Sequence, residues 1–148
     1  MKANNVSDCF EKGLLRRSRV DRERVAGSLK IAAKFLEEAK GNIKMGYYDA
    51  AFLLAYNSMF HTARALIFLE GITERSHYCM ITYLLEKFRT NSSIYPYLDI
   101  LDSYRIVRHR IQYSGEPCGE TDAQEIVDDA VEFLKAVENF ITTLSYYR

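Results

Sequence analysis

The 148-residue chain carries 20 basic and 20 acidic side chains, so its formal net charge is zero. This balance excludes a global field that would draw the protein to nucleic acid or to an anionic membrane, and phosphate binding would have to come from a local patch. With 48% apolar and 27% charged residues, the composition is that of a globular protein with a sizeable core. The length suits one domain.

The cysteines and the N-terminus bear on the compartment. Cys9, Cys79 and Cys118 are odd in number and far apart, and neither a CxxC pair nor Cys/His ligand spacing is present. The sequence therefore indicates neither a disulfide framework nor a metal site, and we expect reduced thiols in a cytoplasmic protein. The N-terminus lacks the apolar run of a signal peptide. Polar side chains interrupt the most apolar stretch, residues 50–71, which favours a buried helix over a membrane span.

The first half of the chain predicts two long helices. Residues 1–20 form an N-terminal extension in which we expect a short helix over 7–17. Apolar residues then recur every three and four positions, which predicts a helix over 21–45 that ends at Gly46. A second helix is expected from Tyr48 to Glu70, with Gly71 as a left-handed cap. Because this helix is apolar on most sides, it should be central in a bundle.

The second half predicts three more helices. Ser76 can cap a shorter one that ends near Phe88. Another begins near Pro96, since proline suits a first turn, and runs to about Tyr113. Thr121–Gln124 has the spacing of a capping box and would open a last helix to about Leu144. No strand pattern is visible. We therefore expect residues 21–148 to form a single all-α domain, an antiparallel up-and-down bundle of four to five helices.

The stretch RIVRHRIQYSG, residues 105–115, holds the most suggestive polar cluster. Helical spacing places Arg105, Arg108, His109 and Gln112 on one side of their helix. Convergent guanidinium groups suit phosphate because each offers a planar fork of donors, and His109 could move protons near neutral pH. The alternative is a solvated face whose arginines pair with nearby acids such as Asp102.

The central helix carries polar residues that a buried segment would not need. Tyr56, Asn57, His61 and Arg64 recur at helical spacing, and polar groups on a buried helix need partners. They could be hydrogen-bonded core residues, or they could form the wall of a polar groove that faces the arginine-bearing helix.

Several segments together resemble the HEPN domain (higher eukaryotes and prokaryotes nucleotide-binding), in particular its small stand-alone archaeal and bacterial members. The resemblance covers about residues 21–142. It is carried by AAKFLEEAK, by GYYDAAFLLAYNSMFHTARALIFLEGITERSHYCMI and by RHRIQYSG before an acidic closing helix. The middle segment is the most specific, because an aromatic-rich helix, a Gly-Ile turn and a Ser-His at the next helix recur together in that family.

The resemblance implies an activity that this chain's motif alters. Many HEPN proteins are metal-independent ribonucleases that have an Arg, four to six residues and then a His, with two copies brought together in a homodimer. Here Arg108 fills the first position but Tyr113 stands where the His is expected. A phenol titrates near 10, so at pH 7 only about one molecule in a thousand carries the phenolate that a general base needs.

Three functions follow from this altered motif. The first is a module that binds nucleotide or RNA phosphate and works with a minimal nucleotidyltransferase in a toxin–antitoxin-like pair. In that system Tyr113 could accept AMP. The second is an active ribonuclease toxin that uses Arg108 with His109 or Tyr113. The third is a dimeric interaction scaffold. In all three we expect no metal or cofactor.

Overall fold

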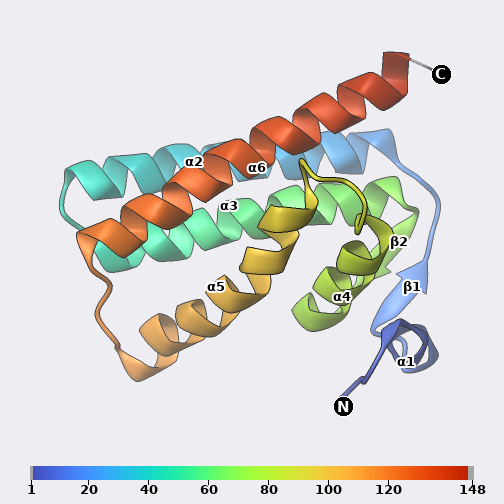
Figure 1. The fold of residues 1–148 in the computed structure, drawn as a ribbon, viewed down its shortest axis with the longest axis horizontal. Helices are drawn as coiled ribbons and strands as arrows, with labels where there is room; N and C mark the ends of the chain where they lie inside the picture. Colours follow the sequence, from blue (N-terminus) through green and yellow to red (C-terminus); the bar gives the residue numbers. More distant parts are fainter. Residues whose placement is uncertain (1, 147–148) are drawn as a thin grey trace.

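The computed structural model describes residues 2–146, with side chains to residue 144, and helices dominate it (Figure 1). In chain order the elements are α1 (Val6–Glu11), β1 (Leu15–Arg17), α2 (Arg22–Lys44), α3 (Tyr48–Leu69), β2 (Ile72–Glu74), α4 (His77–Lys87), α5 (Tyr95–Ser114) and α6 (Glu120–Tyr146).

Four long helices form the predicted up-and-down bundle. In Figure 1, α2, α3, α5 and α6 follow one another in alternating directions, and the shorter α4 lies beside α5. Helix α3 contacts α2, α4, α5 and α6, so it is the central helix, as its apolar sequence predicted. Small residues let α2 and α3 approach closely, and the buried Ser58 donates a hydrogen bond to the Ala32 carbonyl at 2.8 Å. The all-α fold is confirmed.

Most helix ends follow from local chemistry. Asp21 caps α2 by accepting from the backbone of Glu23 and Arg24, and the Ser76 side chain accepts from the Cys79 amide at the start of α4. Gly71 follows α3 with a positive φ of 70°, as predicted for a left-handed cap.

Gly71 also occupies a position where no larger residue fits. A Cβ there would lie 2.9 Å from the Ser18 carbonyl oxygen, in a backbone conformation that L side chains rarely adopt. The Gly71 carbonyl accepts from the Ser18 amide at 2.7 Å. The chain that enters α2 is therefore held directly against the end of α3.

Three local predictions were wrong. The N-terminal helix ends at Glu11, so it covers only part of 7–17, and residues 15–17 form a strand. This strand, β1, pairs antiparallel with β2, with Leu15 opposite Glu74. Each strand has three residues, too few for alternation to be visible in the sequence. Helix α6 begins at Glu120, so Thr121 lies inside its first turn rather than capping it.

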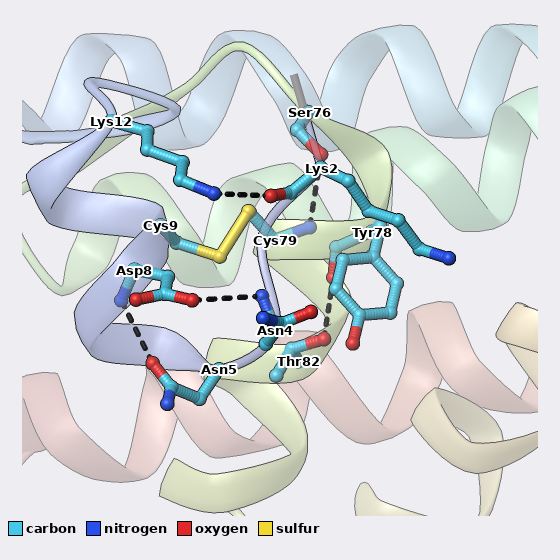
Figure 2. The surroundings of a disulfide bond; sticks show 10 residues. All are labelled: Lys2, Asn4, Asn5, Asp8, Cys9, Lys12, Ser76, Tyr78, Cys79 and Thr82. Atoms are coloured by element: carbon cyan, nitrogen blue, oxygen red, sulfur yellow. Dashed lines mark hydrogen bonds between the residues drawn. A yellow bond between two sulfur atoms is a disulfide. The ribbon is translucent and has the colours of Figure 1, made fainter.

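The expectation of reduced thiols was also wrong, because Cys9 on α1 and Cys79 on α4 form a disulfide (Figure 2). The two residues are 70 positions apart, with their Cα atoms 5.8 Å from each other. The pairing of β1 with β2 brings α1 to α4, which the cysteine spacing could not reveal. Cys118 has a free thiol.

Within the described residues, no helix has both the length and the hydropathy needed to cross a membrane.

Candidate functional site

A pocket of about 300 Å³ lies where the first turn of α4 meets the middle of α5. Its lining residues are Ser76, His77, Tyr78, Arg105, Arg108 and His109. Helix α5 is fixed by its buried face, to which Leu101, Tyr104 and Ile111 belong. The next positions around the helix therefore form the pocket wall. Three of the residues predicted from the 105–115 stretch are thus brought together.

Arg108 is half-buried and lies over an aromatic ring of the central helix. Its guanidinium carbon is 5.0 Å from the centroid of the Tyr56 ring, and its Nη1 donates to the Gln112 side-chain oxygen at 3.1 Å. Its Nε is buried and has no hydrogen-bond partner within the described chain. Among the same residues Arg108 makes no ion pair. Its charge therefore faces the Tyr56 side chain and a neutral amide, and no carboxylate of the described residues pairs with it.

Arg105 has a different environment on the same pocket. Its Nε lies 3.0 Å from the Asp102 carboxylate, three residues earlier on α5, and both side chains are partly exposed. This pair is the one that a solvated face would make, so that interpretation is correct for Arg105. An exposed pair of this kind contributes about 0–1 kcal/mol and can be exchanged for another anion at little cost.

His77 is the site residue that sequence reasoning missed. Its Nδ1 is 3.1 Å from the Tyr56 hydroxyl, and its ring stacks on Phe60 with centroids 4.0 Å apart. Burial, together with the positive charges of Arg108 and Arg105, lowers the pKa of His77 to about 4. His77 is therefore neutral at pH 7. The only sequence signal was the Ser-His pair at the start of its helix.

Tyr56 connects His77 to Arg108. Burial raises the pKa of the Tyr56 phenol, and the opposing effect of the Arg108 charge does not cancel this. The phenol is thus protonated and can donate to an unprotonated Nδ1 of His77, which leaves the imidazole proton on Nε2. Tyr56, predicted as a site residue, lies beneath the pocket and orients two of the side chains that line it.

The C-terminal part of the 105–115 stretch, which includes His109 and Tyr113, is exposed. His109 lines the pocket beside Arg108 even though neighbouring helical residues diverge by about 100°. Both residues were predicted to lie on one side of this helix, and the pocket is wide enough to include both. The Tyr113 ring lies next to the His109 ring, with centroids 4.7 Å apart, and 65% of Tyr113 is exposed. Tyr113 does not line the pocket.

The structure does not bring the other polar residues of α3 to this pocket. Asn57 is half-buried and outside the lining. His61 stacks on Phe35 of α2, with ring centroids 5.7 Å apart, and burial lowers its pKa. Arg64 pairs with Glu74 of β2 at 2.7 Å. The proposed groove wall on α3 is therefore reduced to Tyr56, and Arg64 is held by a structural ion pair.

A larger hollow than this pocket lies elsewhere. It measures about 590 Å³ and lies between the start of α5 and the second half of α6. Its charged lining residues are Glu132 and Lys135, which pair with each other at 3.7 Å. Because these two charges neutralise each other, this hollow is less suited to an anion than the smaller pocket, where Arg108 has no ionic partner among the described residues.

Across residues 2–146, no group of three or more His, Cys, Asp or Glu side chains could hold a metal ion.

The fold agrees with a comparison to known families. The family model for the HEPN domain matches residues 25–140, from the first turn of α2 to the second half of α6. The chain belongs to the HEPN family. Membership supports a nucleotide- or RNA-related module at the family level. No curated protein matches the chain.

Proposed function

We propose that this HEPN domain binds the phosphate of a nucleotide or an RNA in the pocket between α4 and α5. The observation that carries the proposal is Arg108, a half-buried cation on a pocket wall with no carboxylate partner among the described residues. A buried charge without an ionic partner is costly unless a ligand satisfies it. Arg105 lines the same pocket, and its exposed pair with Asp102 leaves it able to turn to a phosphate.

The nature of the pocket favours binding over hydrolysis. Efficient cleavage of RNA needs a group that takes a proton near neutral pH and another that donates one. Tyr113 replaces the expected histidine of the family motif and lies outside the pocket lining. His77 has a pKa of about 4, so at pH 7 it is neutral and is not the protonated imidazolium that a general acid requires.

The direct test is the affinity of the purified protein for AMP and for a short single-stranded RNA. We expect Arg108→Ala to weaken binding by about tenfold or more, since a charge-assisted contact contributes about 1.5–3 kcal/mol. Arg110→Ala is the matched control, because Arg110 is exposed on the same helix and does not line the pocket. Equal affinities of Arg108→Ala and the unchanged protein would refute the proposal.

The partner in this proposal is a separately encoded minimal nucleotidyltransferase. Tyr113 supports such a role because its phenol is exposed beside the pocket. In the transfer, the Tyr113 oxygen would attack the α-phosphate of ATP and release pyrophosphate. Co-expression followed by peptide mass spectrometry should show an adenylylated Tyr113. Tyr47, which is 60% exposed on the turn before α3, is the internal control and should stay unmodified.

A homodimer is the assembly that we propose. Ile106 and Tyr113 are large, exposed and seven residues apart, so they share one face of α5 next to the pocket. A two-fold contact through this face would bring two pockets together. Sedimentation of the protein should give a dimer, and Ile106→Arg should give a monomer that keeps its helical circular dichroism.

A second function, an active ribonuclease, is favoured by one observation. His109 lines the pocket beside Arg108. RNA decay that is lost in both His109→Ala and Arg108→Ala, but kept in Arg110→Ala, would establish this alternative. Decay that is equal in all variants would indicate a contaminating nuclease.

A further inference from the structure

A second pocket adjoins the one at Arg108. It measures about 360 Å³, and the two share Ser76, Tyr78 and Arg105 in their linings. Its other wall comes from the N-terminal segment, where Lys2 and Asn4 line it. The two pockets are therefore adjacent over the first turn of α4, and we refer to them together as the groove, with Arg108 lining one end and Lys2 the other.

The shared residues suit a chain of nucleotides. Tyr78 is 40% exposed and lies between the pockets, so its ring can accept a stacked base. Arg105 reaches both pockets and can contact the phosphate that joins two nucleotides. Lys2 adds a cation at the far end, beside Tyr78 in Figure 2. Cations that follow a groove and an aromatic platform between them are the features that bind single-stranded RNA.

We propose that the second pocket is a second nucleotide subsite, so that the groove takes a dinucleotide or a longer single-stranded RNA rather than a mononucleotide. The proposal further states that the disulfide between Cys9 and Cys79 holds the N-terminal wall of this subsite in place. It rests on the proposed function of the first pocket, which would hold the neighbouring phosphate.

The contacts around the disulfide explain how it would hold this wall. The Asn4 amide donates to Asp8 of α1 at 3.1 Å, and the Lys12 ammonium donates to the Lys2 carbonyl (Figure 2). Residues 2–4 are therefore tied to α1. The disulfide between Cys9 and Cys79 then ties α1 to α4, one residue after Tyr78. Reduction would leave the noncovalent contacts but remove the covalent link that fixes the wall against Tyr78.

The first experiment compares the affinities of AMP and the dinucleotide ApA, measured by isothermal calorimetry on the full chain. We expect ApA to bind at least about fivefold more tightly, because a second base stacks and a second cation is reached. Lys2→Ala should reduce this advantage while leaving the AMP affinity unchanged. Lys30→Ala, an exposed lysine on α2, is the control and should change neither value.

The outcomes separate this inference from the proposed function. If AMP binds in an Arg108-dependent way but ApA binds no more tightly, the second subsite is refuted and the first stands. If neither ligand binds, both are refuted. If ApA binds more tightly but Lys2→Ala keeps the whole advantage, the second nucleotide lies elsewhere and the assignment of this pocket is wrong.

The second experiment tests the disulfide. A dithiol reductant supplies two electrons and two protons, which convert the Cys9–Cys79 bond into two thiols while the reductant closes to a cyclic disulfide. We expect the ApA affinity to fall severalfold toward that of AMP and the AMP affinity to stay constant. Cys118→Ala, which removes the free thiol, should respond to the reductant as the unchanged protein does.

A folding control keeps this test decisive. Circular dichroism of the reduced protein should show that the helices remain, and an unchanged AMP affinity shows that the first pocket is intact. Cys9→Ala should reproduce the reduced state without any reductant. An ApA affinity that is the same in the oxidised protein, the reduced protein and Cys9→Ala would overturn the role of the disulfide.

Discussion

Two arginines, Arg64 and Arg108, lie over aromatic rings in two regions of the same bundle. Arg64 contacts the Phe68 ring and pairs with Glu74, whose side chain is only 7% exposed. Arg108 contacts the Tyr56 side chain and donates a hydrogen bond to the neutral amide of Gln112. In the first region the arginine has its carboxylate partner, whereas in the second no ionic partner lies among the residues that the structure describes. The difference distinguishes an arginine that maintains the fold from one available to a ligand.

The strongest test of the first region is Gly71→Ala. A Cβ at this position would meet the Ser18 carbonyl at 2.9 Å, with φ at 70°. We expect a loss of about 2–3 kcal/mol in the free energy of unfolding. Gly46→Ala is the matched control, because φ is 79° there but no atom beyond the two adjacent residues lies within 4 Å of the added Cβ. Urea denaturation should give the larger loss for Gly71→Ala. Equal losses would mean that the contact with Ser18 relaxes.

Arg64→Ala should have the next largest effect. It would leave the Glu74 carboxylate buried without its partner, and burial already raises the pKa of Glu74. Because Arg64 itself is about a third exposed, we expect a loss of about 2 kcal/mol rather than the larger value of a fully buried pair. Replacing both residues, Arg64→Leu with Glu74→Leu, should recover most of it. The AMP affinity should not change in either variant. A large change would show that Arg64, like Arg108, contributes to ligand binding.

The pH dependence of stability should report the charge around His77. Its pKa is about 4 in the folded protein and 6.5 in the unfolded chain. Between these values the unfolded state binds more protons, so stability falls as the pH is lowered from 6.5 to 4. We expect His77 to account for a loss of about 1 kcal/mol after allowance for solvent screening.

The measurement compares urea denaturation at pH 7 and pH 4.5 for the unchanged protein and His77→Gln. The variant should lose less stability on acidification, since other titrating groups are the same in both. A ligand phosphate beside Arg108 should raise the pKa of His77, which a proton NMR titration with inorganic phosphate can detect. Identical pH slopes in the two proteins would contradict a strongly lowered pKa.

The smallest expected effect completes the comparison. Arg108→Ala should change the free energy of unfolding by less than about 1 kcal/mol, because no ion pair within residues 2–146 is lost and alanine favours a helix. The same change should reduce AMP affinity strongly, as proposed above. A loss of stability as large as that of Arg64→Ala would show that Arg108 is structural.

The fold was largely predictable because helices leave local signals. The spacing of apolar residues and the caps at Ser76 and Gly71 depend only on neighbours in the sequence. The same locality explains why the sequence could place Arg105, Arg108 and His109 on one side of a single helix. Thr121 shows the limit, because a capping-box spacing can also fall inside a first turn.

Features that join distant segments could not be predicted. The pairing of Cys9 with Cys79 requires two three-residue strands to meet, and neither strand has a readable pattern. His77 enters the pocket from another helix, so spacing within 105–115 could not reveal it. On α3, spacing predicted correctly that the polar residues share a helix, but it could not show that Arg64 meets Glu74 while Tyr56 meets Arg108.

The disulfide also makes the two halves of the molecule differ in their covalent connections. Residues 9–79 form a covalently closed ring that contains all of α2 and α3, whereas the only covalent connection of α5 and α6 to this ring is the chain after α4. A protease cut at the exposed turn around Gly46 would leave both fragments linked. A cut in the segment between α4 and α5 would leave the last two helices held only by their packing, and with them Arg105 and Arg108.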